Sequence, residues 1–446
     1  MSNIASSLKS FWRHGKINWL FQLMVIFTIG LSIAIIGCGE DEEDDNGDGD
    51  IVESEIPIVQ GVIVEDQTLT ADTEYLLRGA VKVQDGVTLT IEPGVTLYGE
   101  STTQGTLIIS QGAKIMAEGT ADAPIIMTSD KTEGSRARGQ WGGLIINGRA
   151  PTNHEVDAFG EGNTGSFGGD KPNDNSGVLR YVRVEFAGIE FSPDNELNGT
   201  ALQGVGSGTV IEYVQVHMNQ DDGIEMFGGT VDLKYALVTG ARDDSFDWTN
   251  GWTGKGQFWV AQQYGDDADN GFENDNSDDN NEALPRSAPT IFNVTLVGDP
   301  DGPKGDIGML IREGAAGMYA NFIVTGFKKA GLDVNTPSSH EQANNGNLVV
   351  KNSIFFENGD VNFGDEKDDD GFDEAAWATD LGNEVIDPNL ADPFNKDNPN
   401  FTPGSGSGSI TPAAPPSDSF FDNVNFIGGV DPSNDWTQGW TIRERN

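Results

Sequence analysis

The feature that most constrains the fold of this chain is a unit of about 22 residues that recurs along its middle. Four segments share a pattern of two mostly polar residues, a small residue, an apolar residue and an acid: DDGIE (221–225), DDSFD (243–247), DNGFE (269–273) and KAGLD (329–333). The first two begin 22 residues apart, and the second and third 26 apart. Short β-branched runs such as VIEYVQV (210–216) and VDLKYALV (231–238) keep the same phase. Because one coil of this length cannot bury its apolar side chains alone, the repeat predicts a stack of coils, which is a solenoid.

The residues between these runs favour the same architecture. The chain contains 58 glycines, only 36% of its residues are hydrophobic, and no amphipathic helix of ordinary length interrupts the strands of 81–150. A β-sandwich would show hairpin turns every ~8–12 residues and a propeller would show blades of ~40 residues, and Asn-Gly hairpin signals are scarce here. We therefore predict an all-β fold, a right-handed parallel β-helix of roughly ten to twelve coils with flank insertions and a C-terminal cap. The polar insertions fall at 151–177, 186–200, 264–288, 299–306 and 360–380, and those between 264 and 310 obscure the coil register.

The N-terminus predicts export and a lipid anchor. Residues 1–19 carry three Lys or Arg residues and no acid, and residues 20–36 form an apolar stretch of 17 residues that suits a signal peptide. The stretch runs into IIGC (35–38), which resembles the lipobox of bacterial lipoproteins, so we expect cleavage before Cys38 and lipidation of that cysteine. The alternative is a retained inner-membrane anchor. The predicted organisation is a lipoprotein signal peptide over 1–37, an acidic tether over 38–56, the parallel β-helix over 57–385, and a loop with a C-terminal cap over 386–446.

Charge patterning indicates the nature of the tether and the location of the protein. Residues 39–55 contain ten acids and no base, so this block cannot collapse into a core and is predicted to be solvated. An acidic run just after the lipidated cysteine resembles the signal that sends Bacteroidota lipoproteins to the outer face of the outer membrane. The alternative is an acidic spacer without sorting information. We expect a lipid-anchored outer-membrane protein exposed at the cell surface.

The total charge and the cysteine count exclude two further possibilities. The formal net charge is −45 at pH 7, and nucleic-acid binding needs clustered Lys and Arg against the phosphates. We therefore exclude nucleic acid as a partner. The chain has a single cysteine, so it forms no internal disulfide, and packing or a metal must hold the core together.

Several segments resemble a family of bacterial lipoproteins. The run NELNGTALQGVGSGTVIEYVQV and its continuation to residue 260, together with LTIEPGVTL, QWGGLIINGRA and the ending FIGG…DWTQGWT, is similar to an outer-membrane lipoprotein family of Bacteroidota. The resemblance covers most of residues 80–446. It implies a right-handed, pectin-lyase-like parallel β-helix and a location in the outer membrane. The family has no established biochemical activity, so the resemblance implies no catalytic residue.

The acids of the repeat are the candidate metal ligands. If successive coils stack in phase, the acids form two adjacent columns made of Asp221, Asp222, Glu225, Asp243, Asp244, Asp247, Asp269 and Glu273. Two unit charges ~4.8 Å apart, the strand spacing, repel by roughly 3.5 kcal/mol at an effective dielectric near 20, so a bare and partly buried column is unfavourable. Ca²⁺ is the cation that suits best, since it takes six to eight oxygen ligands in flexible geometry. The segment 266–282 adds eight acids but only partly resembles a calcium loop. The alternative to a metal is a solvated acidic edge that keeps the solenoid soluble.

The same residues raise a second function, that of a carbohydrate-active enzyme. Many parallel β-helices are polysaccharide lyases or glycoside hydrolases, and hydrolysis needs two carboxylates. The candidate catalytic residues are Asp221, Asp222, Asp243 and Asp244. The His-Gly and Arg-x-Lys motifs of polygalacturonases do not follow them. A calcium-dependent lyase also needs a base near the metal, for which Arg242 and Arg312 are the candidates, although Arg242 is explained more simply as an ion-pair partner of the adjacent Asp243.

Tryptophans favour a binding role over catalysis. Trp248, Trp252 and Trp259 lie within twelve residues beside the acids, and indole faces stack on sugar rings. The alternative is that these side chains fill the core. We assign Trp436 and Trp440 to the C-terminal cap. The leading hypothesis is a surface-exposed binding or adhesion module for glycans or for another surface protein, stabilised by Ca²⁺, with the enzyme as the alternative and a purely structural envelope protein as a third possibility.

Overall fold

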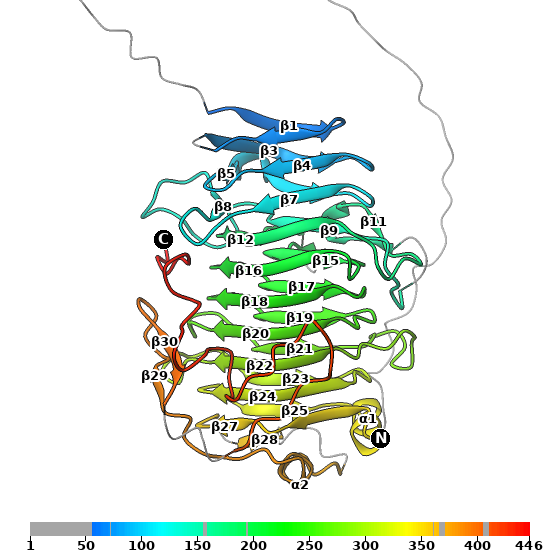
Figure 1. Cartoon of the computed structure of the whole chain (residues 1–446), viewed down its shortest axis with the longest axis vertical. Coiled ribbons are helices and arrows are strands. Elements are labelled where there is room, and N and C mark those ends of the chain that lie inside the picture. Colours follow the sequence, from blue (N-terminus) through cyan, green and yellow to red (C-terminus); the bar gives the residue numbers. More distant parts are fainter. Residues whose placement is uncertain are drawn as a thin grey trace, which may run out of the picture. The chain divides into compact units, whose positions relative to one another are not determined.

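The computed structural model confirms the predicted all-β solenoid with parallel strands (Figure 1). It describes residues 56–446 apart from 72, 155–157, 193–194, 360, 365–370 and 405–409. The predicted signal peptide, Cys38 and nearly all of the acidic tether lie outside the described residues. Within the described part, one sheet of 24 strands winds along a column, and its neighbouring strands run parallel. The architecture is a right-handed parallel β-helix.

The middle of the column is built from alternating long and short strands. The long strands are β12 (Gly177–Glu185), β16 (Val210–His217), β18 (Asp232–Thr239), β20 (Lys255–Gln262), β22 (Thr290–Val297) and β24 (Gly317–Thr325). The short strands are β15 (Thr200–Gln203), β17 (Ile224–Phe227), β19 (Phe246–Thr249), β21 (Phe272–Asn274), β23 (Ile307–Ile311) and β25 (Ala330–Val334). Long strands pair with long strands and short with short, so each coil repeats the one before it.

The coils at the two ends of the column depart from this alternation, and three small hairpins lie outside the main sheet. The N-terminal coils contain β1 (Ile58–Ile63), β2 (Gln67–Leu69), β3 (Glu74–Val83), β4 (Thr88–Ile91), β5 (Thr96–Gly99), β6 (Thr106–Ile109), β7 (Lys114–Glu118), β8 (Ile125–Ser129) and β9 (Leu144–Asn147). The C-terminal coils contain β26 (Leu348–Lys351), β27 (Ile354–Phe356) and β28 (Val361–Phe363). The antiparallel hairpins are β10 (Ala158–Phe159) with β11 (Ser166–Phe167), β13 (Glu190–Ser192) with β14 (Asn195–Glu196), and β29 (Leu390–Asp392) with β30 (Asn400–Pro403).

Each long strand bends at one residue that has a left-handed backbone conformation. The bend residues, with φ between 49° and 65°, are Tyr181, Tyr213, Tyr235, Phe258, Asn293 and Asn321. Positive φ is uncommon outside glycine, so its repetition at one position of successive coils marks a regular corner. The rings of Tyr181, Tyr213 and Tyr235 stack with centroid distances of 4.5 and 4.3 Å, and Phe258 continues the stack at 5.0 Å. We call these four rings the aromatic stack.

Side-chain alternation places the apolar residues inside the column and the acids outside it. Successive residues of a strand point to opposite faces. In β17, Ile224 lies in the core, and the neighbouring Glu225 points away from it. In β19, Phe246 and Trp248 lie in the core on either side of Asp247, and both are 0% exposed. The same packing that buries the hydrophobic residues therefore positions the carboxylates on one outer face.

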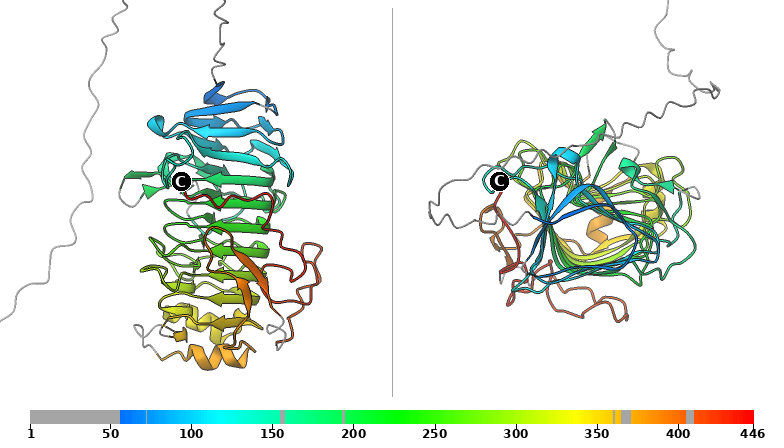
Figure 2. Two further views of the ribbon diagram at one scale, coloured as in Figure 1. Left: turned by 90° about the vertical axis from the view of Figure 1, so that its left-hand side faces the viewer. Right: turned by 90° about the horizontal axis from the view of Figure 1, so that it is seen from above.

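The C-terminal segment lies along the flank of the column, which differs from the predicted cap over its open end. Residues 410–446, which we call the strap, run back from the C-terminal coils toward β12 and β16 (Figures 1 and 2). Trp440 packs edge-on against Tyr181 at 5.5 Å, and Trp436 packs against Tyr235 at 5.4 Å. The strap covers the aromatic stack, so these two tryptophans bury the flank and leave the open end to other residues.

Side-chain amides explain why the strap follows the flank. Gln215 both donates to the carbonyl of Ile442 and accepts from its N–H, each at 2.8 Å. Two other coils repeat this arrangement. The side-chain amide of Gln257 binds the backbone C=O and N–H of Asp422, both at 2.8 Å, and that of Asn321 binds those of Ala413 at 2.9 and 2.7 Å. Each amide thus binds the strap as the backbone of a neighbouring strand would.

His217 is buried between a coil and the strap. Its Nε2 atom lies 2.8 Å from the carbonyl oxygen of Glu444 in the strap, and its Nδ1 atom 2.7 Å from the hydroxyl of Thr239. Burial lowers the pKa of His217 to about 3, so the imidazole is neutral at physiological pH. The side chain holds the strap to the coil and is not a metal ligand.

Two short helices lie near the C-terminal end of the column (Figure 1). These are α1 (Pro337–Asn344) and α2 (Glu374–Asp380), and Asp373 caps α2 by accepting from the N–H of Ala376 at 2.9 Å. Phe372 and Trp377 pack against the main core there, so the region of α2 covers the end of the column. Among the described residues, neither helix has the length and hydropathy of a membrane-spanning segment.

Candidate functional site

One outer face of the column carries a carboxylate on three successive coils. Strands β17, β19 and β21 pair so that Glu225, Asp247 and Glu273 lie side by side at neighbouring positions. The positions before and after them are Ala201 in β15 and Leu310 in β23, so apolar residues end the acidic column on both sides. The longer interval between the second and third repeats is therefore absorbed outside the strands, and the strand register is kept.

The turn before each of these strands carries a second column of acids, which the backbone holds in place. Oδ1 of Asp222 accepts the N–H of Asp244 at 3.0 Å, and Oδ1 of Asp244 accepts the N–H of Asn270 at 2.5 Å. Asn270 continues the series by accepting the N–H of Ile307 at 3.2 Å. Each aspartate thus uses one oxygen to bind the next coil, and its second oxygen is left for another partner.

All eight acids proposed from the sequence as metal ligands come together, and we call them the carboxylate ladder. They form four overlapping groups of three whose oxygen atoms lie within 4.8 Å of one another: Asp221–Asp222–Asp243, Asp243–Asp244–Asp269, Asp222–Glu225–Asp247 and Asp244–Asp247–Glu273. The first two are the outer groups, which reach the surface, and the last two are the inner groups. Clustered hard oxygens of this kind are the ligands that calcium prefers.

Burial and mutual repulsion keep these carboxyl groups close to protonation. Burial, reinforced by the charge of Asp243, raises the pKa of Asp221 to about 8 and that of Asp269 to about 6. Burial first, and neighbouring carboxylates second, raise the pKa well above the ordinary value at Asp222, Glu225, Asp244 and Asp247. Near neutral pH the ladder therefore binds either protons or a cation.

Arg312 supplies a positive charge at one end of the ladder. This residue follows β23 directly, and its Nη2 bonds Glu273 while its Nε donates to Asp275 at 2.9 Å. Burial raises the pKa of Glu273 to about 7, although the guanidinium opposes this shift. The side chain of Arg312 is engaged by these two acids, so it is not free to act as the base of a lyase in this arrangement.

The outer groups open into an acidic groove of about 470 Å³. Its lining includes Glu190, Glu196, Asp221, Asp243, Asp267, Asp269 and Asp306, with Arg242 and Lys304 as the basic residues. Arg242 forms its ion pair with Asp267, which corrects the expected pair with Asp243. Asp267, which precedes β21, contacts the guanidinium, and both side chains are more than two-fifths exposed, so this pair contributes little to stability.

Sequence reasoning missed Asn198, which contacts the inner group that contains Glu225. Its Nδ2 donates to Oε2 of Glu225, the residue is 1% exposed, and its Oδ1 is buried without a hydrogen-bond partner among the described residues. Oδ1 of Asp247 is also buried and unpartnered. Buried oxygens without donors indicate a bound water or ion. Asn198 belongs to the insertion 186–200, whose position over the ladder has no signature in the repeat.

The structure overturns the proposed sugar-binding role of Trp248, Trp252 and Trp259. All three side chains are 0% exposed and belong to the main core. Trp252 and Trp259 stack with a centroid distance of 6.2 Å, and their Nε1 atoms donate to backbone carbonyls within the column. Trp248 follows the outward-pointing Asp247 in β19, so its indole points into the column, and the buried Trp252 and Trp259 present no ring face to a glycan.

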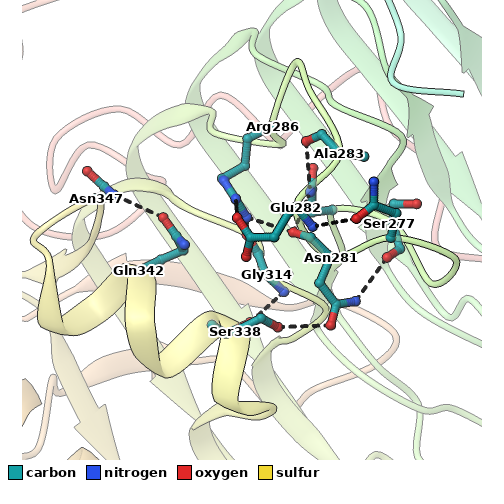
Figure 3. Close-up of polar contacts among 12 residues, drawn as sticks. Ser277, Asn281, Glu282, Ala283, Arg286, Gly314, Ser338, Gln342 and Asn347 are labelled. Carbon is teal, nitrogen blue, oxygen red and sulfur yellow. Dashed lines mark hydrogen bonds and ion pairs between the residues drawn. The ribbon is translucent and has the colours of Figure 1, made fainter.

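The second half of the insertion 264–288 is organised by amides and an arginine instead of by a calcium loop. Asn281 is its centre (Figure 3): its Nδ2 donates to the carbonyl of Ser277 at 3.0 Å, and its Oδ1 accepts from Ser338 of α1 at 3.1 Å. Arg286 donates to the carbonyl of Asn281 at 2.8 Å and pairs with Glu282. This part of the insertion therefore joins α1 to the coils and contributes no ligand to the ladder.

Exposed aromatic surface occurs at a second cavity, at the C-terminal end of the column. Its volume is about 310 Å³, and its lining includes His340, Asn344, Phe372, Asp373 and Trp377. The ring of Phe372 stacks on that of His340 with a centroid distance of 4.7 Å, and its centroid lies 5.7 Å from that of Trp377. Phe372 and Trp377 are both partly exposed. Ring faces beside polar groups are typical of carbohydrate sites.

Comparison with known proteins identifies the family. A model of the pectate-lyase-like β-helix domain matches residues 61–441, which is most of the chain. No curated protein and no solved structure is recognisably similar to it. The chain therefore belongs to the pectate-lyase-like β-helix family, whose fold is compatible with both glycan binding and carbohydrate chemistry.

Proposed function

We propose that this chain is a calcium-binding module of the bacterial cell surface that binds glycans through cations held by the carboxylate ladder. The observation that carries the proposal is the convergence of eight acids into four groups whose oxygens lie within 4.8 Å. Bare carboxylates at this spacing repel strongly, and the described residues provide Arg312 as the basic partner of only one inner group. A bound divalent cation balances the remaining charge.

The donor set favours calcium over other metals. Every ligand in the four groups is a carboxylate, and no histidine or cysteine belongs to any of them. Zinc and copper prefer imidazole and thiolate, whereas calcium takes six to eight oxygens from carboxylates, amides and water. The unpartnered amide oxygen of Asn198 adds a neutral ligand of the right type to an inner group.

The outer groups provide the chemistry for glycan binding through calcium. Ions bound there would face the acidic groove and keep coordination positions open to hydroxyl or carboxylate oxygens of a polysaccharide. Without such ions, a surface with a formal charge of −45 would repel acidic polymers. Binding is therefore expected to depend on calcium. The partly exposed rings at the second cavity offer a separate stacking surface.

Calorimetric titration of the full chain with calcium tests the metal, and pull-down with a panel of insoluble polysaccharides tests the ligand. We expect calcium uptake at neutral pH, and retention of the protein on at least one polymer in calcium but not in chelator. Absence of calcium uptake would remove the basis of the proposal. Calcium uptake without retention on any polymer would restrict the function to a calcium-stabilised surface protein.

The proposed location rests on the sequence around Cys38 and on the resemblance to Bacteroidota lipoproteins. Cleavage after Gly37 would leave Cys38 as the lipidated N-terminus, followed by the acidic tether. The expected result is incorporation of labelled palmitate into the wild-type chain and none into Cys38→Ala. Protease treatment of intact cells should then remove the wild-type protein, whereas protection from protease would contradict surface exposure.

A calcium-dependent polysaccharide lyase is the second candidate function. It is favoured by one observation, the presence of Arg242 and Lys304 in the groove beside the outer carboxylates. A lyase needs a cation to neutralise an acidic substrate and a base to remove a proton. Lys304 is the candidate base, because Asp267 engages Arg242 in the same way as Glu273 and Asp275 engage Arg312. Release of unsaturated oligosaccharides from acidic polymers, lost in Lys304→Ala, would establish this activity in place of simple binding.

A further inference from the structure

The two inner groups of the carboxylate ladder occupy equivalent positions on successive coils but differ in how their charge is balanced. The first consists of Asp222, Glu225 and Asp247, and the second of Asp244, Asp247 and Glu273. They share Asp247, and parallel pairing of β17, β19 and β21 sets them one strand spacing apart, ~4.8 Å. Identical occupancy would place two divalent ions at that separation.

The first inner group has the features of a cation site. Asp222 and Glu225 are 7% and 6% exposed, and no Lys or Arg pairs with either of them in the described part of the chain. Asn198 covers the group, with Nδ2 on Glu225 and a buried Oδ1 that has no donor. Oδ1 of Asp247 is buried without a donor as well. Two enclosed oxygens without donors, next to two further carboxylates, form a set of hard oxygen ligands that has no basic partner among the described residues.

The second inner group already has a positive partner. Arg312 reaches back from the end of β23, with its backbone N–H on the carbonyl of Asn274 at 2.9 Å and its Nη2 on Glu273. Asp275 also holds the guanidinium: Nε of Arg312 donates to Oδ1 and Oδ2 of Asp275 at 2.9 and 3.1 Å. Arginine is always charged and its planar head binds carboxylates in a fixed orientation. The guanidinium therefore stands beside Glu273 as a permanent single charge.

We infer that Arg312 is a built-in counter-ion that takes the place of a calcium ion at the second inner group, so that the inner ladder holds one calcium ion, at Asp222, Glu225 and Asp247. The inference rests on the proposed calcium binding. The physical reason is that the Coulomb repulsion between two ions is proportional to the product of their charges. A guanidinium therefore repels a calcium ion half as strongly as a second calcium ion would at the same distance. Arg312 thereby sets the number of ions and keeps the first site strong.

Calcium stoichiometry, measured by equilibrium dialysis of the full chain and atomic emission with calcium alone as the probe, tests this inference. Arg312→Gln should bind one more calcium ion per chain than the wild type, because the second group loses its own cation. Arg312→Lys should bind the wild-type number, since it keeps the charge. Arg180→Gln is the matched control: its side chain is also 35% exposed and pairs with two carboxylates, Glu118 and Glu212, and it should leave the stoichiometry unchanged.

Glu225→Gln provides a second test, which remains valid if the Arg312 variants do not fold. It should bind one calcium ion fewer than the wild type, and an unchanged number would show that the first inner group is not the site. An Arg312→Gln protein that melts as a folded protein but binds the wild-type number overturns the role of Arg312, while the proposed function stands. A wild-type chain and an Arg312→Gln variant that both bind no calcium overturn the inference and the proposed function together.

Discussion

Raising the pH should destabilise this protein when calcium is removed, and the ladder sets the size of the effect. Burial, partly offset by Arg312, raises the pKa of Glu273 from 4.5 to about 7. Below pH 4.5 both the folded and the unfolded chain hold this proton. Above it, the unfolded chain releases the proton while the folded chain keeps it, so the free energy of unfolding falls as the pH rises and levels off above pH 7.

The magnitude follows from the difference between the two pKa values. A difference of about 2.5 units at 1.36 kcal/mol each corresponds to about 3 kcal/mol from Glu273 alone. Asp221, whose pKa rises from 3.8 to about 8, acts in the same direction and extends the loss of stability to higher pH. His217 opposes this trend between pH 5 and about 6.5, because burial lowers its pKa to about 3, but Glu273 and Asp221 together outweigh it. At roughly 2 °C per kcal/mol for a chain of this size, the melting temperature in chelator should therefore fall by about 6 °C or more between pH 5 and pH 8.5.

Melting of the chelated protein, followed by intrinsic tryptophan fluorescence, checks this expectation, because several of its nine tryptophans are buried. The measurement belongs in high salt, which screens the general repulsion of the acidic surface much more than that of the buried ladder. Added calcium should restore stability, and more so at pH 8.5 than at pH 5, since protons and calcium compete for the same oxygens. A melting temperature in chelator that stays flat or rises with pH would refute the reasoning.

Three further outcomes follow from the packing. Asp222→Asn keeps the acceptor for the N–H of Asp244 but removes a buried carboxyl group that must either carry a charge or take up a proton, so in chelator at pH 8 it should melt above the wild type, while the stabilisation by calcium shrinks. Trp252→Ala should lower the free energy of unfolding by about 3–5 kcal/mol in denaturant titrations and leave glycan retention by the folded protein unchanged. Gln215→Ala loses both bonds to Ile442 and should cost about 1–3 kcal/mol, with faster proteolysis of the strap as the direct readout.

The ladder was predictable from the sequence because the strands hold its register. Asp247 lies 22 residues after Glu225, and Glu273 lies 26 residues after Asp247, yet all three lie opposite one another since the extra residues fall outside the strands. The same rule should have excluded Trp248 as a sugar-binding residue. It is the neighbour of Asp247 in one strand, so the two side chains must point to opposite faces.

The strap and Asn198 were beyond prediction for a different physical reason. Gln215, Gln257 and Asn321 bind the strap through side-chain amides, and such contacts join residues more than 90 positions apart without any period. Asn198 meets the ladder from an insertion whose path depends on the coils beneath it. Hydrophobic periodicity predicts which side chains are buried in the column. It does not predict which loop will bind to the polar side chains on the flank.

The strap changes how the column should come apart. In a solenoid without one, each coil touches only its neighbours, so unfolding can start at an end and proceed coil by coil. Here Asn321, Gln257 and Gln215, on three different coils, are tied to one continuous segment. Fraying of the last coils therefore pulls on the middle ones, which couples them into a single cooperative unit. During synthesis this unit cannot close until residues 410–446 have emerged, so the coils that the strap joins complete their packing after the strap has been made.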